Sequence, residues 1–475
     1  MKKIILLSLG LSLAGLSTSC GDRDLEPTLA QDKELDQLST EADLKVFMNG
    51  VYSIMRDVNY LGRDYQIYGE VRSDNTFANG NSNRFVIESE FRYTPDQGYM
   101  PATWYRIYQV IGRANAVINK GPEAFSGDQD AIRHMIAQAY IIRAMAHFDL
   151  TRIFGQYYVS GEGGMNALAV PYVKVFKGDP ANLYPVRNTV QEVYDFAKGD
   201  IDKAISLINP AKDDYVTKNY ISTGSAYALL SRMALYFKDY SVAETASKKV
   251  IDLGKYSIAT SSNFASTWGS KGANNWIFAL YSNTSNEAVG INSLAYIYRT
   301  PPAGGGYGDI VGLGNLYDIY ESTDVRIASN MVSEKTGDGA GEFRNLGKFP
   351  DTVNGGDDIP IFRYEEVVLN YAEALLKNGN ATLALEWLNK VPAQRNATLY
   401  TVANMENILK ERRKEFAFEG MRLHDLLRTD QGVKLIDPVR QRFSADLPAG
   451  SSQFAFPIPR TEMNVNANMK QNKGY

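Results

Sequence analysis

Residues 364–391 read YEEVVLNYAEALLKNGNATLALEWLNKV, and this stretch decides the fold. Its first half places apolar residues at the helical spacing of three and four, and KNGN then breaks the pattern with glycine and asparagine. The second half resumes the helical spacing through Ala384, Leu388 and Val391. Two helices joined by so short a turn lie antiparallel. The stretch therefore predicts a helical hairpin.

A second hairpin of the same form is predicted over residues 223–253, where the turn reads KDYS. The spacing Tyr240-x-x-Ala243 after this turn matches Ala381-x-x-Ala384 after the first one. Tetratricopeptide hairpins have a similar spacing, because a small residue occupies the point where the two helices cross most closely. We predict three or four imperfect hairpins, dispersed along the chain.

Four further segments have helical periodicity, and two have none. The helical segments are residues 40–55, 104–120, 131–154 and 189–208, the last with a threonine N-cap signal. The segments without long periodicity are residues 60–103 and 258–363, which are rich in Gly, Asn and aromatic residues. Long irregular segments in compact domains are usually functional. The chain is therefore expected to be mainly α, a tetratricopeptide-like helical-hairpin scaffold with two irregular loop-rich insertions.

The N-terminus has the pattern of an export signal. Two lysines precede an apolar run from Ile4 to Leu16, which is too short to span a bilayer. Small residues then lead to Cys20, the only cysteine in 475 residues. This arrangement resembles a bacterial lipobox, in which the thiol is lipidated and the chain is cut before it, although Ser17 stands where leucine is usual. The alternative is an ordinary secretory peptide with an incidental cysteine.

These features give a predicted organisation of the chain. Residues 1–19 are expected to form a lipoprotein signal peptide, and residues 20–39 a lipidated acidic tether. Residues 40–475 are expected to form a single domain, with its irregular region at about 258–363. A cysteine that stands alone has no partner for an internal disulfide.

Composition narrows the class of partner. The formal net charge is −4, so no basic field points to nucleic acid or to an anionic membrane. No other stretch is apolar for 18 residues, so a lipid is the only membrane attachment that the sequence predicts. The chain has 30 tyrosines and 4 tryptophans, and tyrosine combines an apolar ring face with a polar tip. This composition suits a ligand that is hydrated and weakly apolar.

The sequence contains no recognisable catalytic constellation. His134 and His147 are thirteen residues apart on one predicted helix, not at the spacing of a helix-borne metal site, and packing roles are expected for both and for His424. The glycine run at 304–314 lacks the phosphate-loop spacing and is read as a loop. Any two carboxylates could pair as a glycosidase acid and base, but no pair stands out. We predict no metal site and no cofactor, and the residues alone leave a glycan hydrolase open.

Residues 411–428 read ERRKEFAFEGMRLHDLLR and alternate acids with bases on a helix interrupted near Gly420. The favoured interpretation is a buried ion-pair network, in which Glu419 reaches Arg422 and Asp425 reaches Arg428. The alternative is an anion site, built from the four arginines Arg412, Arg413, Arg422 and Arg428.

The same stretch resembles the C-terminal signature of the SusD/RagB family. So does the ending FAFPIPRTEMNVNANMKQNKGY, although family members usually have proline where this chain has Ala467 and Lys473. Further similar motifs are WYRIYQVIGRANAVI, AYIIRAMAHFDLTRIFG, FRYEEVVLNYAEALL, and Cys20 with the acids that follow it. The resemblance covers essentially the whole chain after Cys20.

The resemblance implies a fold and a role. The resemblance implies a surface-exposed outer-membrane lipoprotein that binds nutrients, most often glycans and sometimes peptides, and acts as the lid of a TonB-dependent, SusC-like barrel transporter. It also implies a binding protein and not an enzyme. Their fold is helical, with four tetratricopeptide-like pairs and an irregular second half that carries much of the ligand site. The acids Asp22, Asp24 and Glu26 resemble the signal that exports such lipoproteins to the outer face.

The resemblance also points to candidate ligand-binding residues, because the first loop region commonly supplies contacts in the family. That region offers Asp74, Asn75, Arg84, Tyr93 and Tyr99. It has no tryptophan, which departs from the starch-binding pattern and argues against starch. The second irregular region offers Trp268, Trp276, Tyr296 and Tyr307. Sugar rings stack on aromatic faces and pair with Asn, Asp and Arg. The alternative for each aromatic residue is core packing.

Two classes of function remain open at this point, with a third as a minor reading. The favoured one is an oligosaccharide-binding lipoprotein that serves a transporter, with an oligopeptide as the alternative cargo. The second is a surface hydrolase of glycans on a helical scaffold. The third is a pure scaffold that binds protein partners in its hairpin grooves.

Overall fold

The computed structural model describes residues 35–176, 183–282, 290–299, 307–334 and 342–475. The chain divides into two compact units, Met1–Ser39 and Thr40–Tyr475. In the described part of the first unit, Leu35–Gln37 forms a short 3-10 helix. The predicted signal peptide, Cys20 and most of the predicted tether lie outside the described residues.

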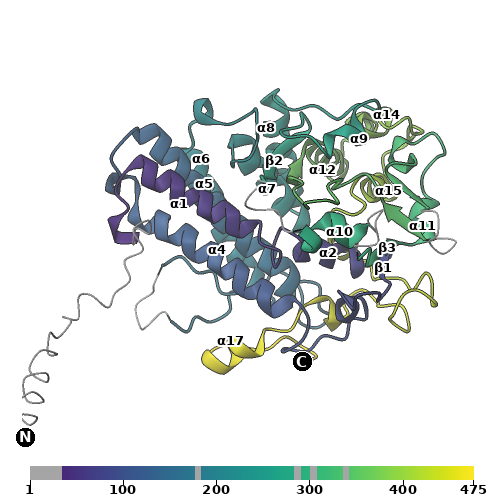
Figure 1. Ribbon diagram of the computed structural model, residues 1–475, viewed down its shortest axis with the longest axis horizontal. Coiled ribbons are helices and arrows are strands. Elements are labelled where there is room, and N and C mark those ends of the chain that lie inside the picture. The colour runs from purple at the N-terminus through teal and green to yellow at the C-terminus, as the bar shows by residue number, and fades with distance from the viewer. Residues whose placement is uncertain (1–34, 177–182, 283–289, 300–306, 335–341) are drawn as a thin grey trace, which may run out of the picture. The chain divides into compact units, whose positions relative to one another are not determined.

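The N-terminal half of the second unit is a set of long helices. They are α1 (Glu41–Met55), α4 (Met100–Lys120), α5 (Gln129–Phe154) and α6 (Val190–Leu207). The four helices lie side by side, with α5 in contact with each of the other three (Figure 1). The four helical segments predicted from periodicity are confirmed, except that α4 begins four residues earlier than Trp104 because Pro101 is tolerated in its first turn.

The N-terminus of α6 is fixed by a capping box. Thr189 Oγ1 accepts a hydrogen bond from the Glu192 amide at 3.2 Å, and Glu192 Oε2 accepts one from the Thr189 amide at 2.8 Å. Two amides that the helix itself leaves without partners are satisfied in this way.

We expect Thr189→Ala to lower the free energy of unfolding by about 1 kcal/mol, since the alanine side chain accepts nothing from the Glu192 amide. Urea unfolding followed by circular dichroism measures this. Thr189→Ser keeps the hydroxyl and is expected to behave as the unaltered protein. Equal losses in the two variants would mean that the cap is not what Thr189 contributes.

The two predicted hairpins are confirmed. They are α7 (Thr223–Tyr236) with α8 (Tyr240–Asp252), and α12 (Tyr364–Lys377) with α13 (Ala381–Leu388). The small residues after their turns, Ala243 and Ala384, are completely buried where the paired helices cross. Helix α8 also packs on α12, so the two hairpins join although they lie more than 100 residues apart in sequence (Figure 1).

Residues 60–103 are more regular than predicted. They contain α2 (Asp64–Val71), β1 (Thr76–Ala78) and α3 (Val86–Ser89), so the prediction of continuous loops is wrong. All eight residues of α2 are buried. A helix that is buried on every side has no apolar stripe, which is why its sequence shows no helical period.

Residues 258–363 also contain short regular elements that the sequence did not indicate. The helical ones are α9 (Phe264–Thr267), Gly290–Asn292, α10 (Leu294–Tyr298), α11 (Gly314–Tyr317) and Val325–Ile327. The strands are β2 (Trp276–Leu280), β3 (Ile310–Gly312), β4 (Val332–Glu334), β5 (Phe343–Asn345) and β6 (Ile359–Arg363). The described strands form a sheet of order β1-β3-β5-β4 and an antiparallel pair of β2 with β6.

The C-terminal segment closes against α2. Its elements are α14 (Lys390–Ala393), α15 (Met405–Glu415), α16 (Arg422–Arg428), the 3-10 helix Ser452–Phe454 and α17 (Arg460–Val465). Two further 3-10 helices lie earlier in the chain, at Pro122–Ala124 and Pro210–Lys212. The predicted interruption at Gly420 is confirmed, because this residue separates α15 from α16 at φ +76°. A Cβ at Gly69 in α2 would lie 1.9 Å from the Gly420 carbonyl oxygen, so the two backbones touch.

Candidate ligand-binding site

The four-stranded sheet brings the two irregular regions together. β1 pairs antiparallel with β3, with Thr76 opposite Gly312 and Ala78 opposite Ile310. Beyond the strands, the Asn79 amide donates to the Asp309 carbonyl at 2.9 Å, and Asn79 Nδ2 donates to the Gly308 carbonyl at 2.9 Å. The loop after β1 is therefore held against the segment that leads into β3.

A cluster of polar and aromatic side chains lies at this junction. We call it the Arg84 cluster, and it consists of Arg63, Arg84, Tyr99, Asn292, Tyr296 and Tyr307. Tyr296 adjoins the others because its carbonyl accepts a hydrogen bond from the Gly308 amide, next to Tyr307, at 3.0 Å. Four of its members were predicted as ligand-binding residues, namely Arg84, Tyr99, Tyr296 and Tyr307, and all four are partly exposed. The structure therefore brings four predicted residues from two distant regions into one neighbourhood.

Arg84 is the central cation of the cluster. Its guanidinium lies over the Tyr307 ring, 3.4 Å from the ring centroid. It donates to Ser82 Oγ at 3.3 Å and to Asn292 Oδ1 at 3.4 Å, and no carboxylate within the described residues lies within 4 Å of it. A guanidinium has five N–H donors, and these two long hydrogen bonds use only part of them. Arg84 therefore keeps donors for a ligand.

Arg63 is the buried cation of the cluster. It donates to Asn292 Oδ1 at 3.1 Å and to Asp64 Oδ1 at 2.6 Å, and lies 5.2 Å from the Tyr99 ring centroid. The Tyr99 ring in turn packs against Phe85, with ring centroids 4.7 Å apart. Asn292 thus links the two arginines, and the Tyr99 ring contacts both a cation and an apolar ring.

Burial sets the protonation of the acids near the cluster. It raises the pKa of Asp64 to about 7, against the opposing charge and hydrogen bond of Arg63. Burial also raises the pKa of Asp309, against the hydrogen bonds from Ser82. The pKa of the Tyr99 phenol is likewise raised by burial, so this hydroxyl remains a donor at neutral pH.

Tyr296 is positioned by a loop that an aspartate organises. Its hydroxyl donates to the Val353 carbonyl at 3.3 Å. Asp351 accepts hydrogen bonds from the amides of Val353 at 3.0 Å, Asn354 at 2.9 Å and Gly356 at 2.9 Å. A side chain that satisfies three amides of its own loop fixes that loop without regular secondary structure.

Asp74 and Asn75 do not belong to the cluster, and their prediction as ligand residues is corrected. Arg422 binds both carboxylate oxygens of Asp74, at 2.7 and 2.8 Å, and Arg413 donates to Asn75 Oδ1 at 2.6 Å. Burial alone would raise the pKa of Asp74, but Arg422 and Arg413 hold it below its usual value. Both residues join the first irregular region to the C-terminal segment.

Tyr93, Trp268 and Trp276 are likewise corrected, because they lie in the interior. The Tyr93 ring packs edge-on against Phe456, with centroids 4.8 Å apart, and its hydroxyl donates to the Gln453 carbonyl. Trp268 and Trp276 are 1% and 0% exposed, so neither indole can contact a ligand at the surface. Core packing, the alternative considered for each aromatic residue, holds for these three.

The arginine-rich stretch 411–428 forms a buried network, as favoured from the sequence. Asp425 accepts from Arg412 at 2.9 Å and from Arg428 at 2.7 Å. The predicted pairing of Glu419 with Arg422 is wrong, because Glu419 accepts from Arg363 at 2.8 Å. The four arginines proposed for an anion site all bind protein acceptors, so this alternative is not supported.

The three histidines pack in the protein, as predicted. His147 is completely buried, with Nδ1 2.8 Å from the Arg143 carbonyl oxygen and Nε2 accepting from the Val173 amide at 2.9 Å. Burial lowers the pKa of His147 to about 3, so it is neutral and donates through Nδ1. Burial lowers the pKa of His134 and of His424 as well.

Sequence reasoning missed Arg63, Asn292 and the loop at Asp351. The run DTVNGG at 351–356 carries an Asx-turn signal that could have indicated an ordered loop. No local sequence pattern indicates a role for Arg63 or Asn292. The two residues are 229 positions apart in sequence and come into contact only in the folded protein.

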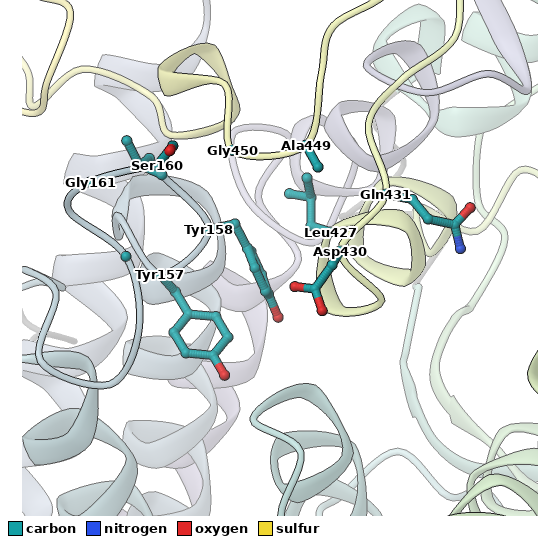
Figure 2. Close-up of a pocket in the computed structure, with 11 residues that line it drawn as sticks. Tyr157, Tyr158, Ser160, Gly161, Leu427, Asp430, Gln431, Ala449 and Gly450 are labelled. Carbon is teal, nitrogen blue, oxygen red and sulfur yellow. The ribbon is translucent and has the colours of Figure 1, made fainter.

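Two other hollows lie away from the Arg84 cluster. One, about 550 Å³, is lined by Tyr157 and Tyr158 on one side and by Asp430 and Gln431 on the other (Figure 2). A larger hollow of about 750 Å³ between α4 and α17 is apolar, and Tyr105 and Val465 on its rim are more than 60% exposed. No predicted ligand residue lines either hollow.

Within the described residues, no group of three or more His, Cys, Asp and Glu side chains is arranged to hold a metal ion. In the same part of the chain, none of the helices has the length and apolar character that a bilayer crossing needs.

Comparison with known proteins places this architecture. Helix pairs packed with an irregular region define a class of tetratricopeptide-like helical proteins. The family described as "SusD family" matches residues 320–475, and the one described as "Starch-binding associating with outer membrane" matches residues 24–235. The chain belongs to the SusD/RagB family, and its fold is the mainly-α fold of that family.

Individual relatives agree with this assignment. SusD-like protein P2 of Formosa agariphila is 24% identical over 100% of this chain and 99% of its own. Starch-binding protein SusD of Bacteroides thetaiotaomicron is 33% identical, but over only 27% of this chain and 22% of its own. Among solved structures, a SusD superfamily protein from Bacteroides thetaiotaomicron has a TM-score of 0.81 and 27% identity, covering 91% of this chain and 99% of that protein.

Proposed function

We propose that this protein is a surface-exposed outer-membrane lipoprotein that binds oligosaccharides at the Arg84 cluster and delivers them to a TonB-dependent, SusC-like transporter. The observation that carries the proposal is the guanidinium of Arg84, stacked on Tyr307 with donors to spare beside Tyr99 and Tyr296. Aromatic faces with fixed donors and acceptors suit the apolar faces and hydroxyl rims of sugars. Relatives described as starch-binding support a carbohydrate as the ligand class.

Binding is favoured over hydrolysis by the state of the nearby acids. A glycosidase needs two carboxyl groups that flank the scissile bond. Three carboxylates near the cluster, those of Asp64, Glu88 and Asp309, are at most 1% exposed, and each already accepts a hydrogen bond from a neighbouring group. None of the three faces a ligand at the cluster. The proposed protein therefore binds its ligand without turnover.

The test is calorimetry on the soluble chain that begins after Cys20. Malto-, cello-, xylo- and chito-oligosaccharides are titrated alongside mixed oligopeptides, and each mixture is then analysed for cleavage. Heat with one sugar series and intact ligand supports the proposal. The expected binding free energy is about −4 to −8 kcal/mol. Heat only with peptides would change the cargo, and cleaved sugar would replace the proposal with a hydrolase.

The anchor and the partner form a separate part of the proposal. We propose lipidation at Cys20, the acids that follow as an export address, and a barrel transporter as the partner. Metabolic labelling with a palmitate analogue should mark the full chain and not Cys20→Ala. Affinity purification from the outer membrane should bring down a TonB-dependent barrel, and its absence would count against the lid role.

A further inference from the structure

A second polar and aromatic hollow lies beside the Arg84 cluster. We call it the Tyr281 cleft, a cavity of about 570 Å³ between α1, the segment before α7 and the end of β2. Its lining residues are Asn49, Tyr52, Ser53, Asp214, Thr217, Asn219, Tyr220 and Tyr281. None of them was predicted from the sequence to bind a ligand.

The cleft combines ring faces with amide groups. Tyr281 is 47% exposed at the rim, and Tyr220 packs edge-on against Tyr52 with centroids 5.4 Å apart. The Tyr220 hydroxyl donates to Asn49 Oδ1 at 3.1 Å. Asn219 Oδ1 is shielded from solvent and accepts no hydrogen bond from the described residues. A buried acceptor without a partner is costly unless a ligand or water supplies a donor.

The charged side chains around the cleft are hydrogen-bonded or paired within the protein. Asp214 Oδ1 accepts from the amides of Val216 and Thr217, at 3.0 and 2.9 Å. Lys271, whose Nζ lies 5.2 Å from the Tyr281 ring centroid, is paired with Asp358 at 2.5 Å. The cleft therefore presents rings, amides, hydroxyls and one hydrogen-bonded carboxylate, and these groups match the ring faces and hydroxyls of a neutral sugar.

One edge of the cleft leads along α1 to the Arg84 cluster. Asn49 and Arg56 are separated by about 10 Å at the helical rise of 1.5 Å per residue. A Cβ at Gly62 would lie 2.0 Å from the Arg56 carbonyl oxygen, so the chain folds back onto the end of α1. Arg63, a member of the cluster, is the next residue.

The opposite edge is connected by hydrogen bonds. Arg56 Nη2 donates to Ser282 Oγ, the residue after Tyr281, at 2.5 Å. Lys271 Nζ donates to the carbonyls of Ser282 at 3.2 Å and Gly356 at 3.4 Å. Gly356 belongs to the loop that Asp351 organises and that positions Tyr296 of the cluster. Backbone and side-chain contacts therefore connect both edges of the cleft to segments that carry members of the Arg84 cluster.

We infer that the Tyr281 cleft is a second subsite for a neutral oligosaccharide, occupied by the part of a long chain that extends beyond the Arg84 cluster. The inference rests on the proposed function and adds a length requirement to it. A short sugar occupies the cluster alone, whereas a longer one of the same series also covers Tyr281 and pairs with Asn219. Affinity then rises with chain length.

The test compares a disaccharide with a hexasaccharide of the malto, cello and xylo series by calorimetry. The variants are Tyr281→Ala, which removes the rim ring, and Ser53→Trp, which fills the cleft from an exposed position. The matched control is Tyr157→Ala, which removes a partly exposed tyrosine from the hollow of about 550 Å³ in Figure 2. The two hollows share no lining residue.

We expect the unaltered protein to bind the hexasaccharide at least about tenfold more tightly than the disaccharide. Tyr281→Ala and Ser53→Trp should lose most of this gain and keep the disaccharide affinity, and Tyr157→Ala should change neither. A full length gain in both cleft variants would overturn the inference while leaving the proposed function intact. Failure of every sugar to bind the unaltered protein would instead remove the proposed function, and the inference with it.

Discussion

Glu415→Gln is expected to lower the free energy of unfolding by about 3–5 kcal/mol, because it removes the charge that three buried arginines share. Glu415 accepts from Arg395 at 2.9 Å, from Arg363 at 3.0 Å and from Arg326 at 3.1 Å. All four side chains are at most 2% exposed. Glutamine has nearly the same shape, so the loss reflects charge and not volume. Urea unfolding of the soluble chain measures it.

The matched control is a pair at the surface. Lys248 and Asp252 form an i, i+4 pair on α8 with both side chains more than half exposed. Exposed pairs contribute little, so Asp252→Asn should cost no more than about 0.5 kcal/mol. If Glu415→Gln were as mild as this control, the buried network would not be a source of stability.

The effect of Glu415 should also depend on pH. Burial alone would raise the pKa of Glu415, but Arg395, Arg363 and Arg326 hold it well below its usual range. A carboxyl group with a lowered folded pKa stabilises the protein above its unfolded pKa of about 4.3 and loses that contribution as the pH falls. The difference in unfolding free energy between the unaltered protein and Glu415→Gln should therefore shrink below about pH 4.

Arg84→Ala is expected to weaken oligosaccharide binding by at least about tenfold, which corresponds to 1.4 kcal/mol. The change removes the donors over Tyr307 while disturbing little of the fold, since Arg84 is partly exposed and makes only two long hydrogen bonds. Calorimetry with the sugar series identified in the screen measures the dissociation constant, and thermal unfolding checks that the variant is folded.

The matched control is Arg92→Ala in the same region. Arg92 is 74% exposed and paired with Glu90, away from the cluster's rings. Its removal should leave the affinity unchanged. Arg84→Lys keeps the charge without the planar fork and should bind with intermediate affinity. An unaltered dissociation constant in Arg84→Ala would mean that the ligand binds elsewhere on the protein.

The helical scaffold could be predicted from sequence because its signals are local. The periodic runs at 223–253 and 364–391, the small residues Ala243 and Ala384 and the cap at Thr189 each depend on neighbours within a few residues. Each hairpin of this kind can therefore be predicted by itself, without knowledge of how the hairpins pack together.

The candidate site could be predicted only in part, because its geometry depends on distant contacts. Residue type and position within an irregular region selected Arg84, Tyr99, Tyr296 and Tyr307 as candidates, and these four lie near one another with partly exposed side chains. The same criteria also selected Trp268 and Trp276, because neighbouring residues in the sequence do not reveal which rings are buried. Arg63 and Asn292 meet only after β1 has paired with β3.

The bond between Asp74 and Arg422 has a consequence for how the chain is made. The two residues are 348 positions apart, and Arg72 reaches the Phe454 carbonyl across 382. A ribosome releases Asp74 long before the arginine that neutralises it, so the early part of the chain cannot reach its final arrangement while synthesis continues. A chain that stops short of residue 422 lacks the counterion of Asp74, so this part of the protein stays incompletely folded.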